Sequence, residues 1–143
     1  MEETLEILQE NLGKALLDTA YMVVISAIIG VVFGTAVALV LYLTENRLFT
    51  PNRVVNVIVG FLVNAIRSLP FLILMVVLIP VAQLLLGDPY TPTGGVISLS
   101  IAAVPFFARI AESAFSEVDP GLLEAAISTG ATTKQIIFEA IFP

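Results

Sequence analysis

Few side chains in this sequence of 143 residues could take part in chemistry, and their types exclude most kinds of active site. Histidine and cysteine are both absent, which removes the common zinc ligands, any disulfide and the usual general base of a nucleophilic triad. Twelve acidic side chains against six basic ones give a formal charge of −6, and no basic stripe is present that would bind nucleic acid. We therefore expect a protein that is not an enzyme, with no catalytic residue, no metal and no cofactor.

Three charged residues stand out because they interrupt apolar sequence. Arg67, Arg109 and Glu112 would be costly inside a membrane, where such groups mark a substrate pathway or an ion pair. The competing interpretation is structural, with Arg109 and Glu112 forming a local pair three positions apart and their side chains reaching the membrane surface. We favour the structural role, and for Arg67 we favour an anchor to phosphate or backbone on the cytoplasmic side.

A short polar segment follows the last long apolar tract and carries its own helix signals. Asp119 can accept hydrogen bonds as an N-cap and Pro120 suits the first helical position. Gly130 suits the left-handed residue that closes a helix. Thr132 and Gln135 fit a capping box, so a further helix starts there. The pattern predicts a short helix over residues 120–129.

Helical spacing divides this short segment into two faces. Leu123, Ala126, Ile127 and Gly130 share one face, whereas Glu124 and Ser128 lie on another. The first face is small and apolar, so we expect a partner to dock on it, while Glu124 near the positive end of the helix dipole can accept from amides or a basic side chain. An ordinary loop helix that folds on its own protein is the alternative.

The elements that position these residues are membrane spans. Hydrophobic residues make up 58% of the chain and charged residues 13%, compared with roughly 45–50% and 25% in average soluble domains. Residues 20–43 would reach about 36 Å as a helix, enough to cross a hydrocarbon core of about 30 Å. Residues 94–115 form a second candidate despite Arg109 and Glu112 near one end. The fold class is therefore an all-α, polytopic membrane helical bundle.

The apolar tract over residues 54–86 needs a break, because one helix of that length would reach about 50 Å. Pro70 supplies it, since proline disfavours helix at the preceding residue. We read residues 54–65 as a lead-in that lies at the interface or is steeply tilted, and residues 69–86 as a span. Pro80 and Pro105 predict kinks within their helices.

Two features concern the first span and its surroundings. Residues 4–17 have helical apolar spacing and predict an amphipathic helix at the interface before the span. Ser26, Gly30, Gly34 and Ala38 form a row of small residues that would let another helix approach closely, although small residues are common in spans generally.

Basic residues gather in the loop after the first span and after the third, which predicts an N-terminus outside and a cytoplasmic polar segment.

The polar segment resembles the EAA loop of permease subunits of bacterial ABC importers. The match is carried by Glu124, Ala125, Ala126, Gly130 and Pro143. Upstream, residues 67–71, residues 79–80, residues 105–109, Glu112 and residues 117–119 are similar to those of methionine-importer permeases. The resemblance implies a coupling helix that fits a groove on a cytoplasmic ATPase subunit.

The same resemblance implies the partners and the activity. We expect import of an amino acid, with methionine as the first candidate, across the bacterial cytoplasmic membrane. The importer would contain a permease homodimer in contact with membrane lipid, two ATP-binding subunits, and an extracytoplasmic substrate-binding protein or lipoprotein. Such permeases have about five spans, so we expect residues 1–143 to be one permease domain that lacks its last two. An ATP-independent transporter or channel piece, with Arg67 and Glu112 as pathway residues, and a small membrane scaffold remain as alternatives.

Overall fold

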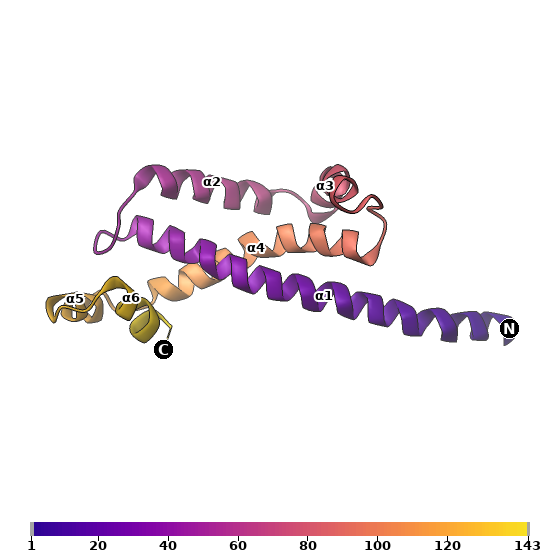
Figure 1. Ribbon diagram of the computed structural model, residues 1–143, viewed down its shortest axis with the longest axis horizontal. Helices are drawn as coiled ribbons and strands as arrows, with labels where there is room; N and C mark the ends of the chain where they lie inside the picture. The colour runs from indigo at the N-terminus through magenta and orange to yellow at the C-terminus, as the bar shows by residue number, and fades with distance from the viewer. Residues whose placement is uncertain (1, 143) are drawn as a thin grey trace.

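The computed structural model describes residues 2–142, and every regular element in that range is helical. The elements in chain order are α1 (Glu2–Glu45), α2 (Arg53–Ser68), α3 (Phe71–Leu86), α4 (Pro92–Ser116), α5 (Pro120–Ser128), α6 (Thr133–Ile136) and a π-helical stretch, η1 (Ile137–Ile141). Figure 1 shows α1 running the length of the molecule, with α5 and α6 near its C-terminal end. The predicted all-α class is confirmed.

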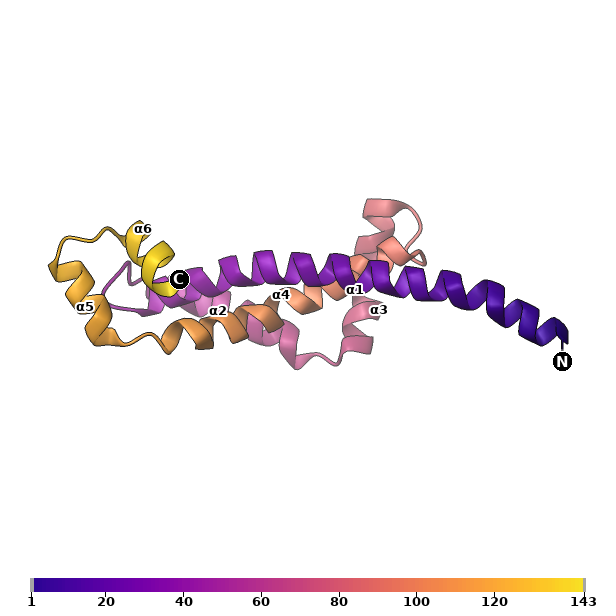
Figure 2. The same ribbon diagram turned by 90° about the horizontal axis from the view of Figure 1, so that it is seen from below.

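The first helix is longer than the sequence suggested. Residues 4–17 and 20–43 were predicted as a surface helix and a span, whereas α1 continues through both without interruption. Gly13, within the first of these segments, lowers helix stability by only about 1 kcal/mol relative to alanine, and no proline is present in either segment to end the helix. The N-terminal part of α1 therefore extends beyond the other helices in both views (Figures 1 and 2).

The row of small residues on α1 is the surface that packs against α4. Ser26, Gly30, Gly34 and Ala38 are all buried. A Cβ atom added at Gly34 would lie 2.7 Å from Cβ of Phe107 and 2.8 Å from the carbonyl oxygen of Val104. Because these distances leave no room for a larger side chain, the small residues allow α1 and α4 to lie in close contact, and the predicted packing role is confirmed.

The apolar tract over residues 54–86 breaks where it was predicted to break. Within the described range, α2 and α3 pass the length and hydropathy test for a membrane span only as a pair, and they are bent by 111° at their junction. Figure 1 looks down the axis of α3 while α1 runs across the view. Residues 69–86, predicted as a span, thus correspond to a helix that lies across α1 rather than along it.

The segment before the break, predicted over residues 54–65, forms the helix α2 (Arg53–Ser68). After the loop, α2 returns antiparallel beside the end of α1, because the Asn56 amide donates to the carbonyl of Leu41 at 3.0 Å and to the Thr44 hydroxyl at 3.3 Å. The side chain of Asn56 thus ties the first turn of α2 to the end of α1. This contact sets the direction of α2, which sequence pattern alone did not predict.

The helix α4 agrees closely with the predicted span over residues 94–115. It begins after Thr91, whose hydroxyl accepts from the Gly94 amide at 3.2 Å, with Pro92 at its first position. It continues through Pro105 to Ser116. By length and composition, α1 over Ile7–Glu45 and α4 over Pro92–Ser116 could each cross a membrane, so the described residues hold three spans if the bent pair counts as one.

Candidate functional site

The predicted start of the short polar helix is confirmed in detail. Asp119 precedes α5, and its Oδ1 accepts a hydrogen bond from the Gly121 amide at 2.7 Å. Pro120 occupies the first helical position, where its missing N–H costs nothing. The helix spans Pro120–Ser128, compared with the predicted residues 120–129.

Ala126 and Gly130 both take part in the hydrogen bonds that end α5. Gly130 has a φ of +86°, the left-handed conformation that was predicted. The Gly130 amide donates to the Ile127 carbonyl and the Ala131 amide donates to the Ala126 carbonyl, both at 3.0 Å. These two bonds form a Schellman motif, and Ala126 and Ala131 both pack against the neighbouring apolar cluster. Ala126 and Gly130 therefore define how α5 ends.

The chain itself covers part of the predicted docking face of α5. Leu123 is 1% exposed and lies in an apolar cluster with Tyr42 of α1 and Phe115 of α4, and the half-buried Ala126 packs against the same cluster. This packing is what stabilises a helix of only nine residues. The other two members of the predicted face, Ile127 and Gly130, are exposed, as are Glu124 and Ala125.

The segment after α5 holds it in place. Thr132 and Gln135 form the predicted capping box, with the Gln135 amide donating to the Thr132 hydroxyl at 3.4 Å and the Thr132 amide donating to Oε1 of Gln135 at 2.9 Å. Ile136 and Ile141 then join the apolar cluster beside α1 and α4. A cavity of about 370 Å³ lies between α5 and α6, with Leu122 and Glu139 among its lining residues. Pro143, the last residue of the predicted motif, lies outside the described residues.

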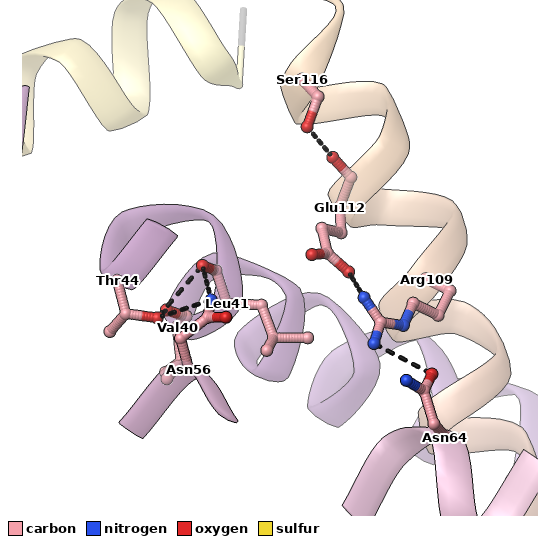
Figure 3. A network of polar contacts seen from close by, with 8 residues as sticks. All are labelled: Val40, Leu41, Thr44, Asn56, Asn64, Arg109, Glu112 and Ser116. Carbon is pink, nitrogen blue, oxygen red and sulfur yellow. Dashed lines mark hydrogen bonds and ion pairs between the residues drawn. The ribbon is translucent and has the colours of Figure 1, made fainter. Parts of the chain in front are cut away.

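A polar network ties α4 to α2, as Figure 3 shows. Arg109 donates to Oε2 of Glu112 at 2.6 Å, which confirms the predicted local pair. Its other terminal nitrogen donates to Oδ1 of Asn64 at 2.9 Å. Sequence reasoning missed Asn64, although an amide side chain within an apolar tract was a signal. The side chains of Arg109 and Glu112 are only 28% and 12% exposed, so the pair lies partly within the bundle.

Arg67, predicted as an anchor to phosphate or backbone on the cytoplasmic side, lies at a bend. It occupies the last turn of α2, just before α3 begins, and α2 runs from the basic loop beside α1 to reach that point. Along α2 it is about 21 Å from Arg53. Arg67 makes no ion pair with any described side chain.

No group of three or more acidic side chains that could hold a metal ion occurs in the described part of the chain, which lacks histidine and cysteine altogether. The features that remain are a short helix presented at one end of the bundle, a partly buried ion pair, and an arginine at a bend that makes no ion pair with a described side chain.

The family model described as "Binding-protein-dependent transport system inner membrane component" matches residues 30–143. The chain belongs to this family. The matched region contains Gly30, Gly34 and Ala38 of the small-residue row on α1, the bend between α2 and α3, and α5. Its description agrees with the multi-pass membrane location predicted from the sequence.

Individual members of the family are similar over most of this chain. The "Probable D-methionine transport system permease protein MetI" of Vibrio cholerae is 42% identical over 126 residues, which cover 88% of this chain and 56% of the relative. The methionine import system permease protein MetP of Bacillus subtilis is 41% identical over 103 residues, covering 72% and 46%. The chain thus spans about half the length of these curated relatives.

Among solved structures, the chain resembles one in the inward-facing MetNI methionine ABC transporter. The TM-score is 0.90 at 33% sequence identity, and the match covers 96% of this chain and 64% of the solved one. The arrangement of α1 to α6 is therefore that of this family of permeases.

Proposed function

We propose that this protein is the permease subunit of an ABC importer in the bacterial cytoplasmic membrane and that it carries an amino acid, methionine in the first place. The observation that carries this proposal is the structural match to the MetNI methionine ABC transporter over 96% of the chain at 33% identity. The permease itself performs no reaction, and ATP is hydrolysed by a separate subunit. Import requires that ATP bind the inward and outward states of the complex with different affinity.

In this proposal α5 is the coupling helix. Glu124 and Ala125 are exposed and face a groove on the ATPase subunit, while Ala126 and Gly130 shape the helix end that presents them. Glu124 is the middle residue of α5, and its exposed carboxylate can accept from a basic side chain of the partner. Pro143 completes the set of coupling residues.

The assembly follows from the same proposal. It contains two copies of the permease, two ATP-binding subunits and an extracytoplasmic substrate-binding protein or lipoprotein, within membrane lipid. The N-terminus lies outside and α5 is cytoplasmic. In support, Figure 1 places the basic loop between α1 and α2, which holds Arg47, at the same end of the bundle as α5.

The test is a single charge reversal on the exposed side of α5. Full-length permease carrying Glu124→Arg is co-expressed with its ATPase and substrate-binding protein, and co-purification and uptake of radiolabelled methionine are measured. We expect at least a tenfold loss of uptake, because a charge-assisted contact at an interface becomes a like-charge repulsion. Glu117→Arg is the matched control, since Glu117 is exposed but lies outside α5.

The control variant should assemble and import like the wild type. Normal assembly and import by the Glu124→Arg variant would remove α5 from the interface. Wild-type uptake that continues without ATP or without the ATPase subunit would favour the ATP-independent alternative.

A further inference from the structure

The bend between α2 and α3 forms a cavity that the family description does not explain. The cavity has a volume of about 270 Å³ and lies between the end of α2, the start of α3 and one face of α4. Arg67 is its only charged lining residue, and Leu69, Phe71, Leu74 and Phe106 provide apolar walls. We call it the elbow pocket. Sites for drug-sized ligands occupy about 300–1,000 Å³, so this volume suits a smaller solute.

The charge of Arg67 has no ion-pair partner among the described side chains at the bend. The residue is exposed in the last turn of α2, about 21 Å along the helix from Arg53. Charged side chains of membrane helices face a bundle interior or a water-filled cavity and commonly mark substrate pathways. The nearby Arg109 is neutralised by Glu112, whereas Arg67 makes no ion pair with a described side chain. An anion in the elbow pocket would supply the missing charge.

The surroundings of Arg67 suit one kind of anion. A guanidinium binds a carboxylate through two parallel hydrogen bonds. Within residues 2–142, no backbone N–H reaches the carbonyls of Arg67 and Ser68, so the end of α2 also keeps acceptors and partial negative charge that favour an ammonium group. Phe71 and Phe106 offer apolar surface to an uncharged side chain. The three features together match an α-amino acid with an apolar side chain.

We propose that the elbow pocket binds the transported amino acid, with Arg67 holding its carboxylate. The proposal rests on the import function proposed above and adds the residue that recognises the solute within the permease. Because the bend places a cation, helix-end carbonyls and aromatic rings around one cavity, it forms a recognition site without any charged residue from a neighbouring helix.

The test compares two ligands on the assembled transporter. Full-length permease with its ATPase subunits is purified, and equilibrium binding is measured for radiolabelled methionine and for methioninol, which has a hydroxyl group in place of the carboxylate. We expect the wild type to bind methionine about tenfold to a hundredfold more tightly than methioninol, as is typical for a hydrogen-bonded charge. In Arg67→Gln this ratio should fall to about one, since the group that distinguishes the ligands is gone.

Matched variants separate recognition from folding. Arg53→Gln removes a cation at the other end of α2 and should keep the wild-type ratio. If Arg67→Gln does not assemble, Arg67→Lys decides, because it keeps the charge and should retain a ratio well above one while losing the bidentate fork.

Several outcomes would overturn the proposal. One is an unchanged ligand ratio in Arg67→Gln, and another is a wild-type complex that imports methionine but binds neither ligand saturably. A defect seen only in vesicles that contain anionic phosphatidylglycerol, and not in phosphatidylcholine alone, would assign Arg67 to lipid. A wild-type complex that imports no apolar amino acid would refute the proposed function itself, and the elbow-pocket proposal with it.

Discussion

At the level of single residues, the contact between Gly34 and α4 is the tightest constraint on α1. The Gly34 backbone lies against Phe107 and the carbonyl of Val104, and a side chain there would meet backbone as well as side-chain atoms. Backbone atoms cannot rotate away as a flexible side chain can, so the strain would spread to both helices. Gly13, in the exposed part of the same helix, has nothing within 4 Å of an added Cβ.

We predict opposite effects for alanine at these two glycines. Gly34→Ala should destabilise the protein by about 1–3 kcal/mol through overpacking. Gly13→Ala should leave stability unchanged or raise it by about 0.4–1 kcal/mol, because alanine restricts the unfolded chain. Thermal unfolding of the full-length permease in detergent measures both. Equal midpoints for the two variants would contradict the packing of α1 on α4 described above.

At the level of elements, α5 is held by one side and open on the other. Leu123 is 1% exposed within the cluster formed with Tyr42 and Phe115, whereas its neighbour Leu122 is 56% exposed. The two leucines have the same chemistry and adjacent positions but opposite exposure. Stability should therefore depend on Leu123 and little on Leu122.

We predict that Leu123→Ala destabilises the protein by about 2–5 kcal/mol, the usual cost of a large cavity in a packed core. Leu122→Ala should change stability by no more than about 0.5 kcal/mol, as is common at exposed positions. Hydrogen exchange of the amides in α5 should rise strongly in the first variant and little in the second. Similar exchange in both would mean that α5 is not anchored through Leu123.

The ion pair of α4 and its hydrogen bond to α2 allow a further prediction at the level of elements. Arg109→Met leaves the carboxylate of Glu112 without its partner, whereas Glu112→Leu leaves the guanidinium with Asn64 alone. Each single variant should lower stability, and the double variant should be less destabilised than the sum of the two, by about 0.5–3 kcal/mol. Denaturation of all four proteins in detergent completes the cycle. Additive effects would show that the pair contributes no energy.

Local sequence signals predicted where these helices begin and end. They predicted less well which other helices each one packs against. Asp119, Gly130 and Thr132 act on backbone groups a few residues away, so their roles followed from residue type and spacing. The buried face of α5 depends on Tyr42 and Phe115, which are distant in sequence, and could not be predicted from the helix alone. The break at Pro70 was predicted for the same local reason, while the course of α2 was not, since it is set by contacts with α1.

At the level of the whole molecule, the proposed topology places the two ends of the bundle in different compartments. The loop between α3 and α4 carries Tyr90, which is 82% exposed, and lies away from α5. The absence of cysteine from this sequence makes the topology easy to test with single introduced thiols.

We predict that Tyr90→Cys reacts with a membrane-impermeant thiol reagent in intact cells, whereas Ser128→Cys reacts only after permeabilisation. The expected order follows from an outside N-terminus and three crossings before α5. The full-length permease without introduced thiols, with any cysteine outside this sequence replaced by serine, is the background control. Labelling of Ser128→Cys in intact cells would reverse the proposed orientation.

The close packing of α1 against α4 limits how these two helices can move. Little space separates the two helices, so one could slide past the other only if they first separated, and we expect α1 and α4 to tilt together as one rigid unit. Asn56 and Asn64 of α2 bond to this unit, and α3 packs against α4. A force on the end of α4 would then tilt the unit relative to the bend at Pro70 and change the width of the space between them.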